Sequence, residues 1–116
     1  MFGMNDPAQT LMQLESYIKD GRLEMAEVMA TQFTDMFLHN KKRNQYQQNM
    51  LVRGLLILCD VLIARNKFAL SMTSAKTLLR ERKKITEPDN TIGNYYQDLQ
   101  RCGKAFALAG KKRKGK

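Results

Sequence analysis

The side chains that most often do chemistry in proteins are sparse in this sequence. It has one histidine, His39, and two cysteines, Cys59 and Cys102, and neither cysteine has a second cysteine or a histidine at the spacing of a metal site. Both cysteines fall within apolar helical patterns, which predicts reduced thiols in a core. His39 stands in a polar stretch beside Asn40 and Lys41, so we expect it in an exposed loop.

Motifs that build catalytic or cofactor sites are missing from the sequence as well. There is no zinc-protease motif, no nucleophile elbow, no glycine-rich phosphate loop and no cluster of carboxylates. Gly103 and Gly110 are accounted for by helix packing and capping. We therefore predict that the protein is not an enzyme and that it carries no cofactor and no metal.

Positive charge is the strongest chemical signal, and it lies in one half of the chain. The formal net charge is +9. Residues 1–60 hold six basic and seven acidic side chains, whereas residues 61–116 hold fourteen basic and four acidic side chains. Such asymmetry permits an anionic partner, which includes an acidic protein surface, RNA, DNA or a membrane. The charge alone does not choose among them.

The basic residues form two groups that suit an anionic partner. One group is Lys76, Arg80, Arg82, Lys83 and Lys84, and the other is Lys111, Lys112, Arg113 and Lys114. Four residues of the first group end a predicted helix, where the helix dipole alone favours cations, and no aromatic residues for base stacking are interleaved. We therefore rank nucleic-acid binding second, as the alternative to protein binding. The second basic group also suits a nuclear import signal or a solvated tail.

Hydrophobic spacing predicts an all-α chain of about five helices that position these groups. Leu11, Leu14 and Ile18 recur at steps of three and four between an Asp6-Pro7 helix start and a turn at residues 20–21. Similar apolar faces run through the later segments, and polar or proline-containing stretches separate them. The predicted helices cover residues 7–20, 22–38, 46–64, 68–84 and 91–109.

These elements make one domain, because 116 residues are too few for two ordinary ones. We expect an N-terminal extension at residues 1–6, a helical domain at 7–110 and a basic tail at 111–116. The domain should consist of antiparallel hairpins at 7–38 and 46–84, followed by a lone helix at 91–109.

The segment at 50–64 is apolar nearly all round, yet it does not fit a membrane span. It has fifteen residues and contains Arg53 and Asp60, whereas a span needs roughly 20 mostly apolar residues. We expect it as a buried helix in the middle of the structure. No secretory signal pattern opens the sequence, so we expect an intracellular protein of the cytoplasm or nucleus, with no membrane partner.

The hairpins share one register of packing positions. These are Leu55, Leu58, Cys59, Leu62, Phe68, Ser71, Ala75 and Leu78 in the second hairpin, and Leu14, Tyr17, Gly21, Leu23, Ala26, Ala30 and Phe33 in the first. Cys59, Ser71 and Ala26 take places where helices cross closely and need a small side chain. A partial third copy follows at Leu99, Cys102, Gly103, Phe106 and Gly110, and the offsets of 45 and 44 residues make the repeats irregular.

This register resembles that of the tetratricopeptide repeat family over roughly residues 8–110. The run at residues 62–68, between an irregular first hairpin and a partial third one, is similar to the N-terminal end of the seventh-subunit family of the anaphase-promoting complex. The resemblance implies a right-handed stack of helix pairs. It also implies a scaffold segment, pairing with itself, within a cell-cycle ubiquitin ligase.

We therefore predict that the chain binds other protein subunits. In solenoid repeats the first helix of each pair supplies most of the concave groove. On the solvent side of the 46–64 segment, the residues that fit this role are Gln47, Gln48, Arg53 and Asp60. A face that is only solvated has the same composition. The ends of a short stack must also be covered. For a homodimer contact, the 22–38 segment offers Met25, Met29, Met36 and Phe37, which equally suit an ordinary core.

Overall fold

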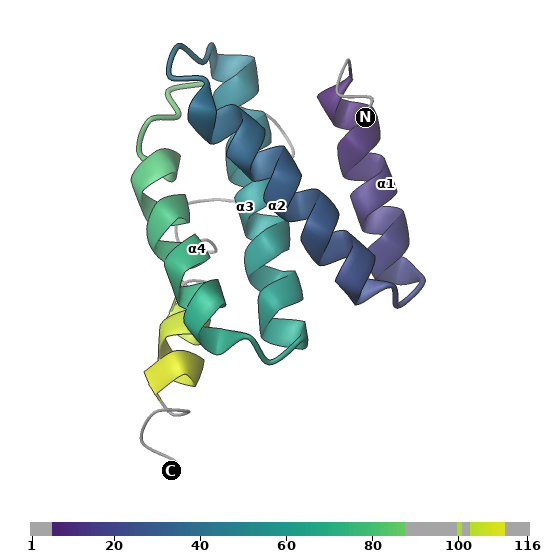
Figure 1. Ribbon diagram of the computed structural model, residues 1–116. Coiled ribbons are helices and arrows are strands. Elements are labelled where there is room, and N and C mark those ends of the chain that lie inside the picture. The colour runs from purple at the N-terminus through teal and green to yellow at the C-terminus, as the bar shows by residue number, and fades with distance from the viewer. Residues whose placement is uncertain (1–5, 88–99, 101–102, 111–116) are drawn as a thin grey trace.

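The computed structural model describes residues 6–87, 100 and 103–110, and over these ranges it is all-α (Figure 1). The four long helices are α1 (Pro7–Lys19), α2 (Leu23–His39), α3 (Gln45–Ala64) and α4 (Phe68–Arg82). A further short helix covers residues 103–110. The all-α prediction is confirmed. The predicted boundaries of the first four helices agree with the structure to within two residues.

Local capping explains where the helices begin and end. At the start of α1, Asp6 Oδ1 accepts a hydrogen bond from the Ala8 amide at 3.1 Å, and α1 gives way to a turn in which Gly21 has a φ of +78°. At the start of α3, the Asn44 side chain accepts from the Gln47 amide, and the Gln47 side chain accepts from the Asn44 amide. This reciprocal pair satisfies two backbone donors that the helix itself leaves unpaired.

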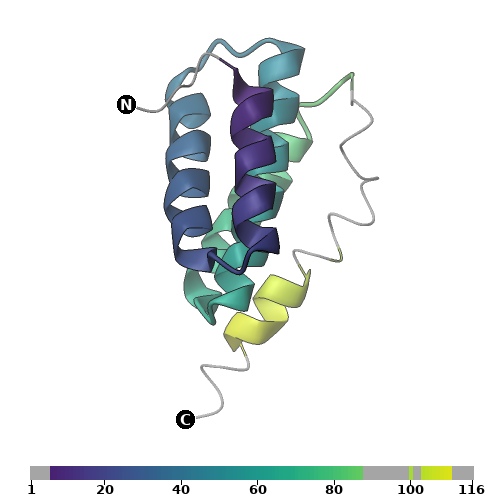
Figure 2. The same ribbon diagram turned by 90° about the vertical axis from the view of Figure 1, so that its right-hand side faces the viewer.

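The helix α3 is the centre of the structure. It packs against α1, α2 and α4, and helices that follow each other in the chain run antiparallel (Figures 1 and 2). Of the described helices, α3 alone is long and apolar enough to cross a membrane, and 67% of its most apolar stretch is buried inside the protein. A core helix has this property, and the burial agrees with the central position expected from the sequence.

Small residues lie in the contacts between the helices. Cys59 and Ser71 are fully buried, and the Cys59 thiol lies 3.7 Å from the Ser71 carbonyl oxygen, which joins α3 to α4. Ala26 and Ala30 of α2 are fully buried as well. The small-residue positions proposed from the register are therefore inside helix contacts, and Cys59 is a buried free thiol as predicted.

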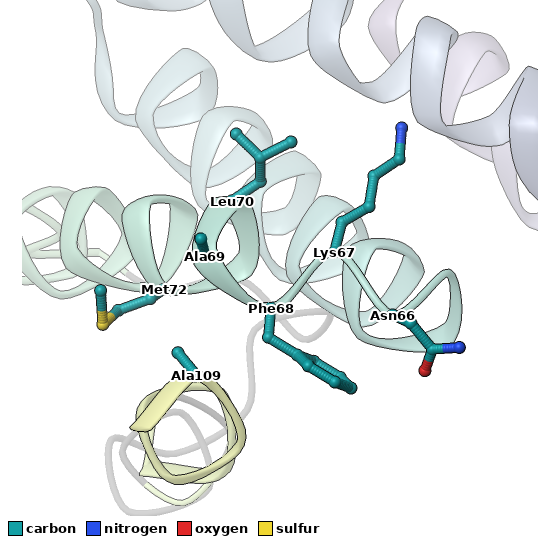
Figure 3. Close-up of a pocket in the computed structure, with 7 residues that line it drawn as sticks. All are labelled: Asn66, Lys67, Phe68, Ala69, Leu70, Met72 and Ala109. Atoms are coloured by element: carbon teal, nitrogen blue, oxygen red, sulfur yellow. The ribbon is translucent and has the colours of Figure 1, made fainter. Parts of the chain in front are cut away.

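The last helix lies beside the first turns of α4 (Figures 1 and 3). Ala105 and Ala109 are buried, and Phe106 packs partly buried against the core. Residues 91–99 of the predicted fifth helix, together with Cys102 and the tail at 111–116, lie outside the described residues.

Candidate protein-binding surface

The outer face of α2 exposes a row of apolar side chains. Met25, Val28 and Met36 are 47%, 55% and 37% exposed. With Gln32 they follow one another at steps of three and four residues, which places them on one side of the helix. The buried residues of α2, which include Met29 and Phe33, occupy the neighbouring side of the helix. We call this row, in which Gln32 separates Val28 from Met36, the α2 stripe.

A groove opens beside the α2 stripe, between α1 and α2. It has a volume of about 360 Å³ and is lined by Tyr17, Glu24, Met25, Val28 and Met29. Tyr17 is held in place by its phenolic oxygen, which lies 3.1 Å from the Gln13 side-chain amide one turn earlier. Among the described residues the groove is therefore mainly apolar, with the one carboxylate of Glu24.

A second apolar groove lies on the other side of the molecule. It has a volume of about 490 Å³ and runs along the start of α4, lined by Asn66, Lys67, Phe68, Ala69, Leu70, Met72 and Ala109. Figure 3 shows Ala109 pointing from the helix at 103–110 toward α4. Sequence reasoning did not single out Leu70, which is 53% exposed.

Two of the four residues predicted on the α2 interface are almost fully buried, although Met29 still lines the wall of the α1–α2 groove. Met29 and Phe37 are buried, and the Phe37 ring meets the Phe33 ring edge to face at a centroid distance of 5.0 Å. They face α3 because they fall on the same side of α2 as Ala26, Ala30 and Phe33. Met25 and Met36 remain exposed, and Val28 joins them.

The four residues predicted on α3 are not brought together as one surface. Gln47 caps the helix, Arg53 forms an ion pair with Glu15 of α1 at 2.9 Å, and Asp60 is exposed near the other end of α3. Gln48 was expected on the solvent side, and this is wrong because it is 4% exposed. It is buried because it faces the end of α4, where it contacts Glu81.

Glu81 and Arg43 are the polar centre of that end of the molecule. The Arg43 guanidinium donates to Glu81 Oε1 at 2.7 Å, to Gln48 Oε1 at 2.7 Å, and to the carbonyl oxygens of Phe37 and Asn40. The side chains of Arg43 and Glu81 are 8% and 3% exposed. Arg43 therefore ties the end of α2 to α3 and α4.

Four groups stabilise the charged form of Glu81. Burial acts to raise its pKa, but hydrogen bonds from Gln48, Lys84 and Arg80, and the charge of Arg43, lower the pKa below its ordinary value. Glu81 is consequently a carboxylate at neutral pH. We call Arg43, Gln48, Arg80, Glu81 and Lys84 the Glu81 cluster.

A second carboxylate fastens α2 to the turn between α3 and α4. The Glu27 carboxylate forms ion pairs with Arg65 at 2.6 Å and with Lys67 at 2.9 Å. Partial burial acts to raise the pKa of Glu27, whereas hydrogen bonds from Lys67 and Arg65 and their charges lower it overall. Both carboxylates therefore act as structural anions.

The basic residues predicted on and just after α4 as an anionic-partner patch differ in their surroundings. Arg80 and Lys84 both pair with Glu81 at 3.2 Å, and Arg82 is half-buried. Lys76 and Lys83 are exposed. The second predicted group, at residues 111–114, lies outside the described residues.

Sequence reasoning missed Arg43 and Glu81 because they lie 38 positions apart and belong to no local pattern. The available signal was a lone carboxylate among Arg80, Arg82, Lys83 and Lys84. An isolated acid in a basic helix end has several possible partners, and the fold decides which one it meets.

The chain matches no protein-family model, no curated protein and no solved structure. Within residues 6–87, 100 and 103–110, no group of three or more His, Cys, Asp or Glu side chains is placed to hold a metal ion. The surface chemistry of this chain therefore carries the functional argument.

Proposed function

We propose that this protein is a helical protein-binding module, and that the α2 stripe with its adjoining groove receives an amphipathic helix of a partner. The observation that carries this proposal is the exposure of Met25, Val28 and Met36 in one row. Exposed apolar side chains arranged along a groove are typical of helix-in-groove recognition. Methionine suits such a surface because its flexible side chain adapts to different partner side chains.

The charges beside the α2 stripe favour a basic partner. Glu24 and Asp35 are exposed on α2, and α2 contains no lysine or arginine. A partner helix with apolar side chains at steps of three and four, flanked by lysine or arginine, would complement both features. Charge complementarity of this kind speeds association and selects among apolar partners.

The packing of the helices supports a tetratricopeptide-like scaffold as the setting of this surface. α3 contacts both helices of the preceding hairpin as well as its own partner α4, and small residues occupy the close contacts. Stacked repeats bury their cores in this way and leave helix faces for partners. Membership of a cell-cycle ubiquitin ligase in the nucleus or cytoplasm rests on the sequence resemblance alone.

A binding role without catalysis fits the chemistry of the described residues. Glu27 and Glu81 each have a lowered pKa, and each is held in its charged form by at least two cations. A general acid needs a raised pKa, so neither suits proton donation at neutral pH. Their contacts stabilise the helix arrangement.

The proposal is tested by placing a charge on the α2 stripe. Val28→Glu and Met36→Glu each introduce a carboxylate on the exposed row, and Thr73→Glu is the matched control because Thr73 is exposed on α4. Each of the four forms is immobilised, and the proteins that each form retains from an extract of cells expressing the chain are compared. Partners retained by wild type and Thr73→Glu but lost by both stripe variants support the proposal.

Identical partners for all four forms, at unchanged melting temperature, would overturn it. Light scattering of the purified protein at several concentrations separates two kinds of partner. A dimer that Val28→Glu dissociates and salt leaves intact identifies a second copy as the occupant, whereas a monomer assigns the α2 stripe to another protein.

Nucleic-acid binding remains the second candidate, favoured by the exposed cations Lys76 and Lys83 on the α4 side. Binding of a single-stranded oligonucleotide over a salt series measures it. Affinity that falls steeply with salt and decreases in Lys76→Glu would support this function.

A further inference from the structure

A pocket lined by cations lies at the end of the molecule where α2 and α4 both finish. Its volume is about 360 Å³, and its lining residues are Leu38, Lys41, Arg43, Arg80, Glu81 and Lys84. Four of these side chains are cationic and one is a carboxylate, which leaves three positive charges in excess. None of the six lines the α1–α2 groove.

The floor of this pocket is rigidly held. Arg43 is fixed by the carbonyl oxygens of Phe37 and Asn40 at 2.8 and 2.9 Å, and by the side chains of Gln48 and Glu81. Glu81 Oε1 receives Arg43 and Gln48, while Oε2 receives Arg80 and Lys84. The carboxylate therefore holds three cations, Arg43, Arg80 and Lys84, at the pocket.

The cations at the rim keep donors for a second anion. The side chains of Arg80 and Lys84 are 61% and 53% exposed. Among the described residues, Arg80 contacts Glu81 through Nε only, and the Lys84 ammonium makes one hydrogen bond. Both terminal nitrogens of Arg80 and further protons of Lys84 thus remain for a ligand. Lys41 adds an exposed ammonium from the connection between α2 and α3.

The remaining charge fits a dianion. Two helix C-termini end at this pocket, and each is equivalent to about half a negative charge, so the excess is reduced to about two positive charges. Phosphate monoesters and pyrophosphate carry about two or more negative charges at neutral pH, and a guanidinium donates to two phosphate oxygens at once. We propose that this pocket, formed by Lys41, Arg43, Arg80 and Lys84 around Glu81, binds a doubly charged phosphate group.

The test uses inorganic phosphate and pyrophosphate as probes. Calorimetry and thermal unfolding are measured for wild type, Arg80→Gln and Lys84→Gln, against sodium chloride of equal ionic strength. The controls are Lys76→Gln and Lys83→Gln, which remove exposed cations from the same part of the chain but do not line the pocket. We expect pyrophosphate to raise the melting temperature of wild type. We expect Arg80→Gln and Lys84→Gln each to weaken binding by about 5- to 10-fold, and the controls to bind as wild type.

Equal weakening in all four variants would show attraction to total charge and would overturn the site. No rise in melting temperature beyond the chloride reference would overturn it too. A single-stranded oligonucleotide is the third probe. If it binds while phosphate and pyrophosphate do not, the cations serve singly charged phosphodiesters, and the dianion proposal is wrong.

Glu81→Gln should change the affinity for pyrophosphate in the opposite direction. It removes the one carboxylate among the described residues that line the pocket, and it leaves Arg43 without this counter-ion. We expect pyrophosphate to bind this variant about 10-fold more tightly than wild type, because the ligand then replaces the lost anion. Equal affinity for the two forms would place the bound anion elsewhere. If Glu81→Gln does not fold, the comparison of Arg80→Gln and Lys84→Gln with their controls decides the proposal.

Discussion

The Arg43 guanidinium and the Glu81 carboxylate meet at 2.7 Å, across 38 residues of chain, with both side chains almost fully buried. A buried charge that loses its partner is strongly destabilising, because desolvation is no longer offset by the ion pair. The pair closes the structure by joining the α2–α3 connection to the last turn of α4. Further hydrogen bonds join α3 to the backbone just after α4. The Gln45 side chain accepts from the amides of Thr86 and Glu87, and the Asn49 side chain donates to the Glu87 carbonyl oxygen.

Removing one member of this pair should destabilise the whole protein. We expect Arg43→Met to lower the free energy of unfolding by about 3–5 kcal/mol, because the buried Glu81 loses its shortest ion pair and keeps only the more exposed Arg80 and Lys84 at 3.2 Å. The double variant Arg43→Met with Glu81→Leu should recover most of that loss, since apolar residues often replace a buried ion pair at little cost. Urea unfolding followed by circular dichroism measures both.

The matched control for Arg43 is Arg53→Met. Arg53 also pairs with a glutamate across two helices at 2.9 Å, but its side chain and that of Glu15 are 24% and 51% exposed. An exposed pair contributes about 0–1 kcal/mol, so Arg53→Met should unfold at nearly the wild-type urea concentration. Equal losses for the two variants would mean that burial does not distinguish these ion pairs.

Acid should destabilise the protein through Glu27 and Glu81. The folded-state pKa of each lies below the ordinary value of 4.5, so the unfolded chain binds more protons in this range. The stability from these carboxylates is fully present above pH 4.5 and is lost as the pH falls through their folded-state pKa values. Urea midpoints measured from pH 7 down to pH 3 should therefore decrease below pH 4.5.

Substitution of each carboxylate separates its contribution to the acid effect. Glu81→Gln and Glu27→Gln should be less stable than wild type at pH 7, and each should show a weaker dependence on pH below 4.5. The two stability curves should then converge toward that of wild type at low pH. An unchanged slope in both variants would assign the acid effect to other groups.

The crossing of α2 and α3 depends on the missing side chain of Gly54. A Cβ atom at this position would lie 2.7 Å from Phe33 Cδ1 and 3.1 Å from Thr34 Cγ2. Alanine normally stabilises a helix interior by about 0.5–1 kcal/mol relative to glycine. Here the buried Phe33 ring must shift, so we expect Gly54→Ala to lower the free energy of unfolding by about 1–3 kcal/mol.

Gly103→Ala is the control for this close contact. A Cβ atom at Gly103 meets no atom of the described residues within 4 Å, and Gly103 is the first residue of the helix at 103–110. Its melting temperature should therefore equal or slightly exceed that of wild type. If Gly54→Ala also melts at or above wild type, the packing of Phe33 against α3 is looser than the structure indicates.

The helix boundaries followed from the sequence because their causes are local. Asp6 lies next to the helix that it caps, and the Gly21 turn interrupts one apolar period before the next begins. Such signals need no knowledge of the partner helices. The central position of α3 was predictable for a similar reason, since a helix that is apolar on every side must be covered on every side.

The orientation of α2 was not predictable in the same way. Its apolar residues occupy both sides of the helix, so periodicity alone does not tell which of Met25, Met29 and Met36 faces inward. The position of α1 and α3 decides it, and places Met29 in the core and Met25 outside. Gln48 illustrates the same limit, because its burial depends on Arg43 and Glu81, which only the fold brings to it.

Ser71 gives a direct test of the close contact between α3 and α4. Ser71 is fully buried, its hydroxyl donates to the Phe68 carbonyl oxygen at 2.8 Å, and its own carbonyl oxygen contacts the Cys59 thiol. We expect Ser71→Leu to lower the free energy of unfolding by about 1–3 kcal/mol, because the larger side chain forces the two helices apart. Ser71→Ala, which keeps the small volume and removes only a hydrogen bond within α4, should be clearly more stable than Ser71→Leu. Urea unfolding compares the three forms, and a Ser71→Leu protein as stable as wild type would contradict the small-residue register.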